Sequence, residues 1–399
     1  MCGLSMIKQD HFRQDQKIYL QYNITVLCLT GRLDDVRCTM SENVYYQLRD
    51  ILDKMPNGFP ATGDGLEIRI LKKIFTEEEA GIAVLLKMKY ETADAVAART
   101  GRDAGYMKNI LAKMAGQGQI FGINLGETII YKLAPFVFGI YEFQINRIDR
   151  ELAEMVHEYF YRDFGKEFYG HKPALMKVVP IEKEIAHDSI VKTYESATGL
   201  IENAKSWAIG ECICKKEMGI LGDECTKPTE VCMAIAPLEH YFDNFFWGRP
   251  ITKEDAFRIL RMAEDAGLVH MISNIREGHI YICNCCGCCC GVLRGLNELN
   301  QPDVVSRSNY RARVDAGSCS GCGVCLDRCQ VRAIDMDGVA TVNERCIGCG
   351  LCASGCPSSV ITLVRRDESE FEYVPRDEKD WNRKRAKSRG RNDYKELLK

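Results

Sequence analysis

Two cysteine runs in the C-terminal third of the chain have the spacing of iron–sulfur ligands. Each run reads C-x2-C-x2-C-x3-C. Three thiolates two residues apart on a tight loop can turn toward one metal–sulfide cubane, and the fourth ligand then comes from elsewhere. In two-cluster proteins of this type, the last cysteine of each run ligates the other cluster. The spacing therefore predicts two [4Fe-4S] sites, one with Cys319, Cys322, Cys325 and Cys356 and one with Cys346, Cys349, Cys352 and Cys329.

The residues around these runs favour clusters over other thiol chemistry. Backbone without a Cβ can approach the sulfides and point N–H groups at them, and glycines stand beside the cysteines at Gly321, Gly323, Gly348 and Gly350. Pro357 follows the last cysteine of the second run, whereas Gln330 has that place in the first. Structural zinc rarely needs eight cysteines in this order, so zinc is the weaker alternative.

Through these motifs, residues 318–364 resemble the bacterial two-cluster ferredoxin domain. The apolar runs 331–334, 339–342 and 360–364 are expected to form its paired strands. The whole chain is similar to multidomain ferredoxin-type proteins of anaerobic bacteria and archaea. This resemblance implies single-electron transfer to or from a partner oxidoreductase.

A second concentration of cysteines lies in the middle of the chain, where six cysteines occupy the eight positions 283–290. A hairpin is expected to lead directly into this segment, and the Cys212-Ile213-Cys214 segment follows another short apolar run. If the ends of these two strands converge, their thiols meet at one point, as a metal site requires. A third [4Fe-4S] cluster is the preferred interpretation, with Cys212, Cys214, Cys283 and Cys285 as first candidates. Zinc held by four thiolates and free thiols are the alternatives. Three further cysteines could replace any of the first four, namely Cys225, Cys232 and Cys286.

Composition restricts the class of protein. The 399 residues are 46% hydrophobic and 27% charged, with a net charge of -3 that favours neither nucleic acid nor membrane. No apolar run approaches the roughly 18 residues that span a bilayer. No secretory signal is recognisable, so the 21 cysteines indicate a reducing, anaerobic cytoplasm in which thiols serve metals.

The elements predict an α+β chain. Residues 1–39 are an unassigned leader, and Met40 is an alternative start of translation. Ser41 is expected to begin a helix within a helical and winged-helix-like domain, residues 40–135. Within it, Thr76, Thr92 and Asp103 are expected to cap three helices that precede a hairpin.

The small excess of positive charge in this domain gives little support to DNA binding. Residues 66–135 contain ten Lys or Arg against eight Asp or Glu. The third helix offers mainly Lys108, Asn109 and Lys113 to a groove, which is few for a protein that contacts phosphates. A structural or protein-docking role is therefore the expectation.

A mixed, cysteine-rich middle domain is expected over residues 136–300. Its aromatic residues at 136–168 are interpreted as core. Helices are expected from Ser189 to Trp207, from Pro228 through Cys232, and from Thr252 to Gly267. The ferredoxin-like domain follows at 310–364, and the charged residues 365–399 are expected to be a flexible tail.

No nucleotide-binding motif or nucleophile–histidine pattern accompanies the cysteines. The leading hypothesis is therefore an intracellular electron carrier that relies on a redox partner. One alternative is a redox-sensing DNA-binding regulator. Another is an oxidoreductase whose catalytic site lies in the middle domain.

Overall fold

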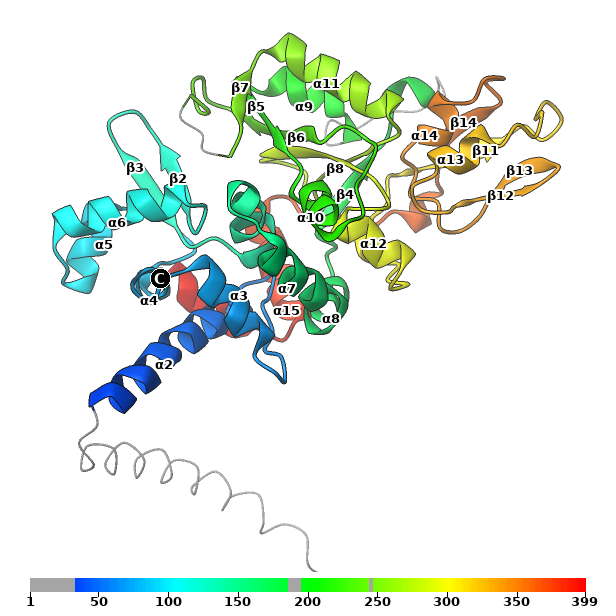
Figure 1. The fold of residues 1–399 in the computed structure, drawn as a ribbon. Coiled ribbons are helices and arrows are strands. Elements are labelled where there is room, and N and C mark those ends of the chain that lie inside the picture. Colours follow the sequence, from blue (N-terminus) through cyan, green and yellow to red (C-terminus); the bar gives the residue numbers. More distant parts are fainter. Residues whose placement is uncertain (1–32, 186–194, 244–246) are drawn as a thin grey trace, which may run out of the picture.

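The computed structural model describes residues 33–185, 195–243 and 247–399, which form a mixed α/β arrangement (Figure 1). A seven-stranded sheet lies between the N-terminal helices and a small cysteine module near the C-terminal end of the chain (Figure 1). Within the described part of the chain, no helix has the length and apolar character needed to cross a membrane.

The N-terminal part contains helices and a three-stranded antiparallel sheet of order β1-β3-β2. The expected caps are confirmed: Thr76 forms a capping box with Glu79, and the side chains of Thr92 and Asp103 accept hydrogen bonds from helix N–H groups. The elements are α2 (Leu33–Lys54), α3 (Leu66–Ile74), α4 (Glu77–Leu85), β1 (Glu91–Thr92), α5 (Ala93–Thr100), α6 (Ala104–Gly116), β2 (Phe121–Asn124) and β3 (Ile129–Lys132).

One helix start differs from expectation. Helix α2 already runs from Leu33, so the prediction that Ser41 caps it is wrong. Only the N–H groups in the first turn of a helix lack a partner within the helix. Ser41 lies beyond the first turn of α2, so it has no such N–H groups to cap. The leader 1–32 lies outside the described residues.

The aromatic segment that follows is core, as predicted. Phe136 packs against Phe59 with ring centroids 4.6 Å apart, and Phe164 stacks on Phe168 at 4.8 Å. All four side chains are buried. Two helices provide much of this cluster, α7 (Arg150–Tyr161) and α8 (Asp163–Tyr169).

The central sheet has the strand order β10-β4-β8-β9-β6-β5-β7, and only its β10–β4 pair is parallel. Helices α9 and α11 cover one face, and α10 lies on the other (Figure 1). The elements are β4 (Met176–Val179), α9 (Ala197–Asn203), β5 (Ser206–Glu211), α10 (Ile213–Leu221), β6 (Glu230–Ala236), β7 (Arg249–Ile251), α11 (Lys253–Asp265), β8 (Val269–Ser273), β9 (Tyr281–Cys285), α12 (Gly291–Asn297) and β10 (Val305–Ser306).

Two helix predictions in this region are corrected. Cys232 lies in strand β6, not on a helix, and Trp207 lies in strand β5. A short apolar run is compatible with both a helix and a strand. Here both segments are strands because they pair with neighbouring strands of the sheet. The expected start at Ser189 lies outside the described residues. The helix from Thr252 and the β8–β9 hairpin are confirmed.

The C-terminal cysteine module, residues 310–365, is built from two antiparallel strand pairs, β11–β14 and β12–β13. The run 339–342 forms a strand as predicted, whereas the predicted strand at 331–334 lies three residues later. The first strand, β11, has no counterpart in the prediction. The elements are β11 (Tyr310–Val314), α13 (Val324–Arg328), β12 (Ile334–Asp337), β13 (Val339–Val342), α14 (Leu351–Ser354) and β14 (Ile361–Arg365).

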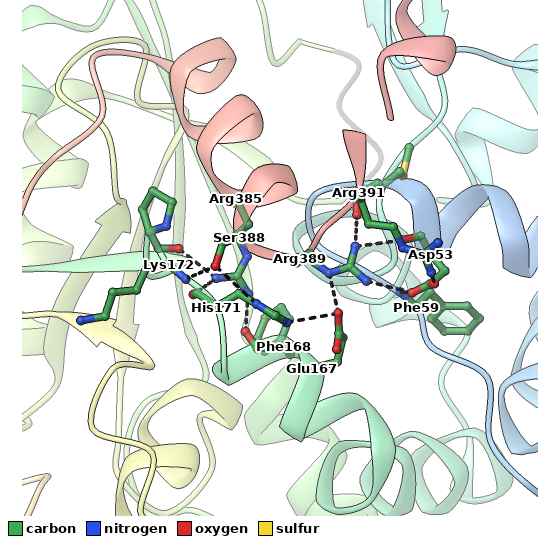
Figure 2. A network of polar contacts seen from close by, with 12 residues as sticks. Asp53, Phe59, Glu167, Phe168, His171, Lys172, Arg385, Ser388, Arg389 and Arg391 are labelled. Carbon is green, nitrogen blue, oxygen red and sulfur yellow. Dashed lines mark hydrogen bonds and ion pairs between the residues drawn. The ribbon is translucent and has the colours of Figure 1, made fainter. Parts of the chain in front are cut away.

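The residues after β14 are folded, in contrast to the flexible tail expected from their charge. They include helix α15 (Glu378–Ser388), which packs beside α8 (Figure 1). Arg385 is fully buried and donates to the carbonyl oxygens of Phe168, His171 and Pro173 (Figure 2). The Nη1 and Nη2 groups of Arg385 thus donate to backbone carbonyls in the interior, a role that composition alone does not reveal.

Candidate metal centres

Both cysteine loops of the C-terminal module turn through left-handed glycines. Gly321 has φ 68° and Gly348 has φ 71°. A Cβ on Gly321 would lie 2.4 Å from the Gly338 carbonyl oxygen, and one on Gly348 would lie 2.1 Å from that of Tyr310. Both positions therefore require glycine for conformation and for space. Each loop then enters a short helix, α13 or α14, that carries the third cysteine of its run.

The structure gathers the eight cysteines of this module around two cavities. The last cysteine of each run lines the cavity of the other run, as the spacing suggests. We call the two cavities the outer and the inner cavity. The outer cavity is lined by Cys319, Cys322, Cys325 and Cys356, and the inner cavity by Cys329, Cys346, Cys349 and Cys352.

The cysteines of the inner cavity are more buried than those of the outer cavity, and the remaining lining of the inner cavity is mostly apolar. Burial raises the pKa of Cys349 to about 12 and also raises that of Cys352. These free thiols are therefore protonated at neutral pH, and a bound metal would displace the protons. The Ala333 N–H donates to the Cys329 sulfur over 3.1 Å, the kind of contact that favours thiolate.

The outer cavity is closer to solvent, since Cys322 is exposed. Backbone N–H groups of Ala340 and Gly321 hold the pKa of Cys319 below its ordinary value. The two cavities thus offer the same type of ligand but differ in exposure to solvent. Solvent exposure is one of the factors that set the reduction potential of a bound cluster.

Two arginines fasten the module to the middle domain. Arg328 donates to the carbonyl oxygens of Glu264 (2.9 Å) and Asp265 (3.1 Å) at the end of α11. Arg345 donates to the Leu296 carbonyl oxygen of α12 over 3.1 Å. The Ile181 N–H also donates to the carbonyl oxygen of Cys349 over 3.0 Å. The inner cavity therefore lies on the side of the module that faces the middle domain.

Six cysteines of the middle domain form a closed ring of thiols, which we call the six-thiol ring. Each thiol has two others as neighbours, close enough to shift its pKa. The thiols come from β6, β9 and the N-terminal ends of α10 and α12. The order around the ring is Cys212, Cys214, Cys290, Cys285, Cys283 and Cys232.

The ring contains all four first candidates from the sequence and adds Cys232 and Cys290. Cys290 was missed, because a run of six cysteines in eight positions does not reveal which side chains turn the same way. Cys232 enters through strand pairing. The β6–β9 register aligns Met233 with Ile282, which brings Cys232 beside Cys283.

Two titratable groups lie near the ring, the buried Lys215 and the half-buried Glu142. Burial acts to lower the pKa of Lys215, but the charges of neighbouring thiols, Cys212 foremost, outweigh it and raise that pKa. Burial raises the pKa of Glu142 to about 7. Six thiolates exceed what one tetrahedral ion binds, so the ring suits a centre with several metal ions.

The remaining four cysteines of the middle domain form a second group, the four-thiol group. It consists of Cys225, Cys286, Cys288 and Cys289, and its sulfur atoms all lie within 4.8 Å of one another. Cys225 and Cys286 were candidates from the sequence, whereas Cys288 and Cys289 were not assigned. The structure therefore divides the ten cysteines between two sites, where the sequence indicated one.

Comparison with known families agrees with part of this picture. The model of the 4Fe-4S binding domain matches residues 339–362, which contain the complete second cysteine run. The chain therefore contains a 4Fe-4S binding domain there, which supports at least one [4Fe-4S] cluster. Searches of curated proteins and of solved structures give no significant match.

Proposed function

We propose that the protein is an iron–sulfur electron-transfer protein that exchanges single electrons with a partner oxidoreductase. The observation that carries the proposal is the grouping of eight cysteines around two cavities, with Cys329 and Cys356 exchanged between the runs. When bound, a [4Fe-4S] cluster supplies reversible one-electron chemistry. Four thiolates per cavity are the ligand set that this cluster requires.

The protein residues have separate roles in this proposal. Apolar side chains of the inner cavity exclude water, and the Ala333 N–H stabilises the Cys329 thiolate. Arg328 and Arg345 hold the module in one orientation against the middle domain. The exposed edge at Cys322 is the side on which a partner would approach.

The six-thiol ring is the proposed third iron–sulfur site. Its thiols are buried or half-buried, and they outnumber the ligands of a single ion. The nearby Lys215 supplies a positive charge that offsets part of the thiolate charge. A catalytic role for the ring is the alternative, and electrons from the C-terminal module would then be used there.

The regulator hypothesis has weaker support. The helix, strand, two helices and hairpin of residues 77–132 fit a winged-helix arrangement. However, Lys113 of the third helix forms an ion pair with Glu79 (2.8 Å), which leaves Lys108 as the main cation of the exposed helix face. A protein that contacts several phosphates needs more positive charge.

Paired cysteine variants test the proposed ligand sets. Cys356→Ser should alter the same cluster as Cys319→Ser, although Cys356 belongs to the second run. Cys329→Ser should likewise resemble Cys346→Ser. The measurement is the EPR spectrum of the reduced protein, together with iron content and anaerobic redox titration. The proposal fails if Cys356→Ser resembles Cys346→Ser, or if the wild-type protein shows no reversible one-electron reduction.

A further inference from the structure

The four-thiol group has the dimensions of a site for one metal ion. The sulfur atoms of Cys225 and Cys286 are 3.8 Å apart, those of Cys225 and Cys288 are 3.7 Å apart, and those of Cys288 and Cys289 are 3.6 Å apart. Zinc binds thiolates at about 2.3 Å in a tetrahedron, whose corners are then about 3.8 Å apart. The observed spacing agrees with that value.

Other thiol chemistries fit this geometry less well. All four thiols are free, so the group is not a pair of disulfides. A cubane places four irons and four sulfides between its ligands and therefore needs thiolates that are farther apart. Among the described residues, no other group of three or more His, Cys, Asp or Glu side chains is as compact. The cysteines around the outer and inner cavities are more widely spaced, as clusters require.

We propose that Cys225, Cys286, Cys288 and Cys289 bind a single Zn²⁺ ion in a closed, structural site. Four thiolates complete the tetrahedron and leave no position open for a substrate, which is typical of structural zinc. Cys225 lies between α10 and β6, and the other three ligands lie between β9 and α12. The ion therefore joins two loops that are distant in sequence.

The location of the site gives the ion a specific structural role. The Gly287 N–H, within the zinc-binding loop, donates to the Gln330 side-chain oxygen over 2.8 Å. Asn297 donates to the Gln330 carbonyl oxygen over 2.9 Å. Gln330 directly follows Cys329, which lines the inner cavity. The zinc ion thus stabilises the loop on which the C-terminal cysteine module rests.

Metal analysis of the full-length protein tests this site. Anaerobically purified wild type should contain about one zinc per chain. Cys225→Ser should lose this zinc and keep the iron and acid-labile sulfide of the wild type. Cys232→Ser, which changes the six-thiol ring, is the matched control and should keep the zinc. Loss of iron instead of zinc from Cys225→Ser would overturn the proposal.

X-ray absorption at the zinc edge of the wild type provides a second measurement that needs no variant to fold. The expected result is four sulfur ligands at about 2.3 Å. Nitrogen or oxygen ligands, or the absence of zinc, would overturn the assignment. The iron content is measured separately, so failure of the zinc site is distinguishable from failure of the proposed electron-transfer function.

Discussion

Substitution of Gly287 by alanine tests the contact between the zinc-binding loop and the C-terminal cysteine module. A Cβ at this position would lie 2.2 Å from the Gln330 carbonyl oxygen and 3.0 Å from the Asn297 side-chain nitrogen. Side-chain Cβ atoms essentially never approach a neighbour closer than 3.0 Å, so the loop and Gln330 must separate by at least about 0.8 Å. The obstacle is backbone, which has little room to move.

The expected cost follows from two contributions. Overpacking of a close contact costs about 1–3 kcal/mol. Separation also weakens the hydrogen bond from Gly287 to Gln330, which adds about 1 kcal/mol. Gly287→Ala should therefore be destabilised by about 2–4 kcal/mol.

The matched control is Gly219→Ala in helix α10. No atom lies within 4 Å of a Cβ at Gly219, so alanine should be neutral or stabilising by up to about 1 kcal/mol. Anaerobic scanning calorimetry of the metal-loaded proteins provides the comparison. Hydrogen exchange should also accelerate in residues 286–289 and 329–331 of Gly287→Ala alone. If Gly287→Ala unfolds at the same temperature as Gly219→Ala, the contact does not exist as described.

Two further predictions concern stability. Arg385→Ala should lower the free energy of unfolding by about 3–5 kcal/mol, because it leaves buried carbonyl oxygens without donors. The control Arg383→Ala changes an exposed residue of the same helix and should lower it by less than about 1 kcal/mol. Equal unfolding temperatures of the two variants would contradict the burial of Arg385. Burial lowers the pKa of His279 to about 4, so the unfolded chain binds the additional proton and stability falls as pH falls from about 6.5 to about 4. His279→Gln should flatten this part of the stability curve, and an unchanged slope in thermal unfolding across that range would refute the assignment.

Local spacing made the C-terminal module predictable. Three cysteines two residues apart share one loop, and the exchange of Cys329 and Cys356 follows from a known pattern. The N-terminal helices were also predictable, because capping side chains such as Thr76 act within one turn. These features depend on contacts between residues that are close in sequence.

The middle domain was less predictable, because its sites depend on pairing between distant segments. Cys232 reaches the six-thiol ring only when β6 pairs with β9, and its apolar surroundings gave no local preference for a strand. The division of the run 283–290 between two sites depends on where β9 ends and α12 begins. Burial of Arg385 likewise depends on carbonyl groups about 200 residues away.

Iron, acid-labile sulfide and zinc counts on anaerobically purified full-length protein test the central claim most directly. The proposed sites predict about twelve iron atoms and about twelve sulfides per chain, with about one zinc. About eight iron atoms would leave the two cavities of the C-terminal module filled and remove the six-thiol ring from the proposal. Fewer than about eight would contradict the claim that those two cavities each hold a [4Fe-4S] cluster.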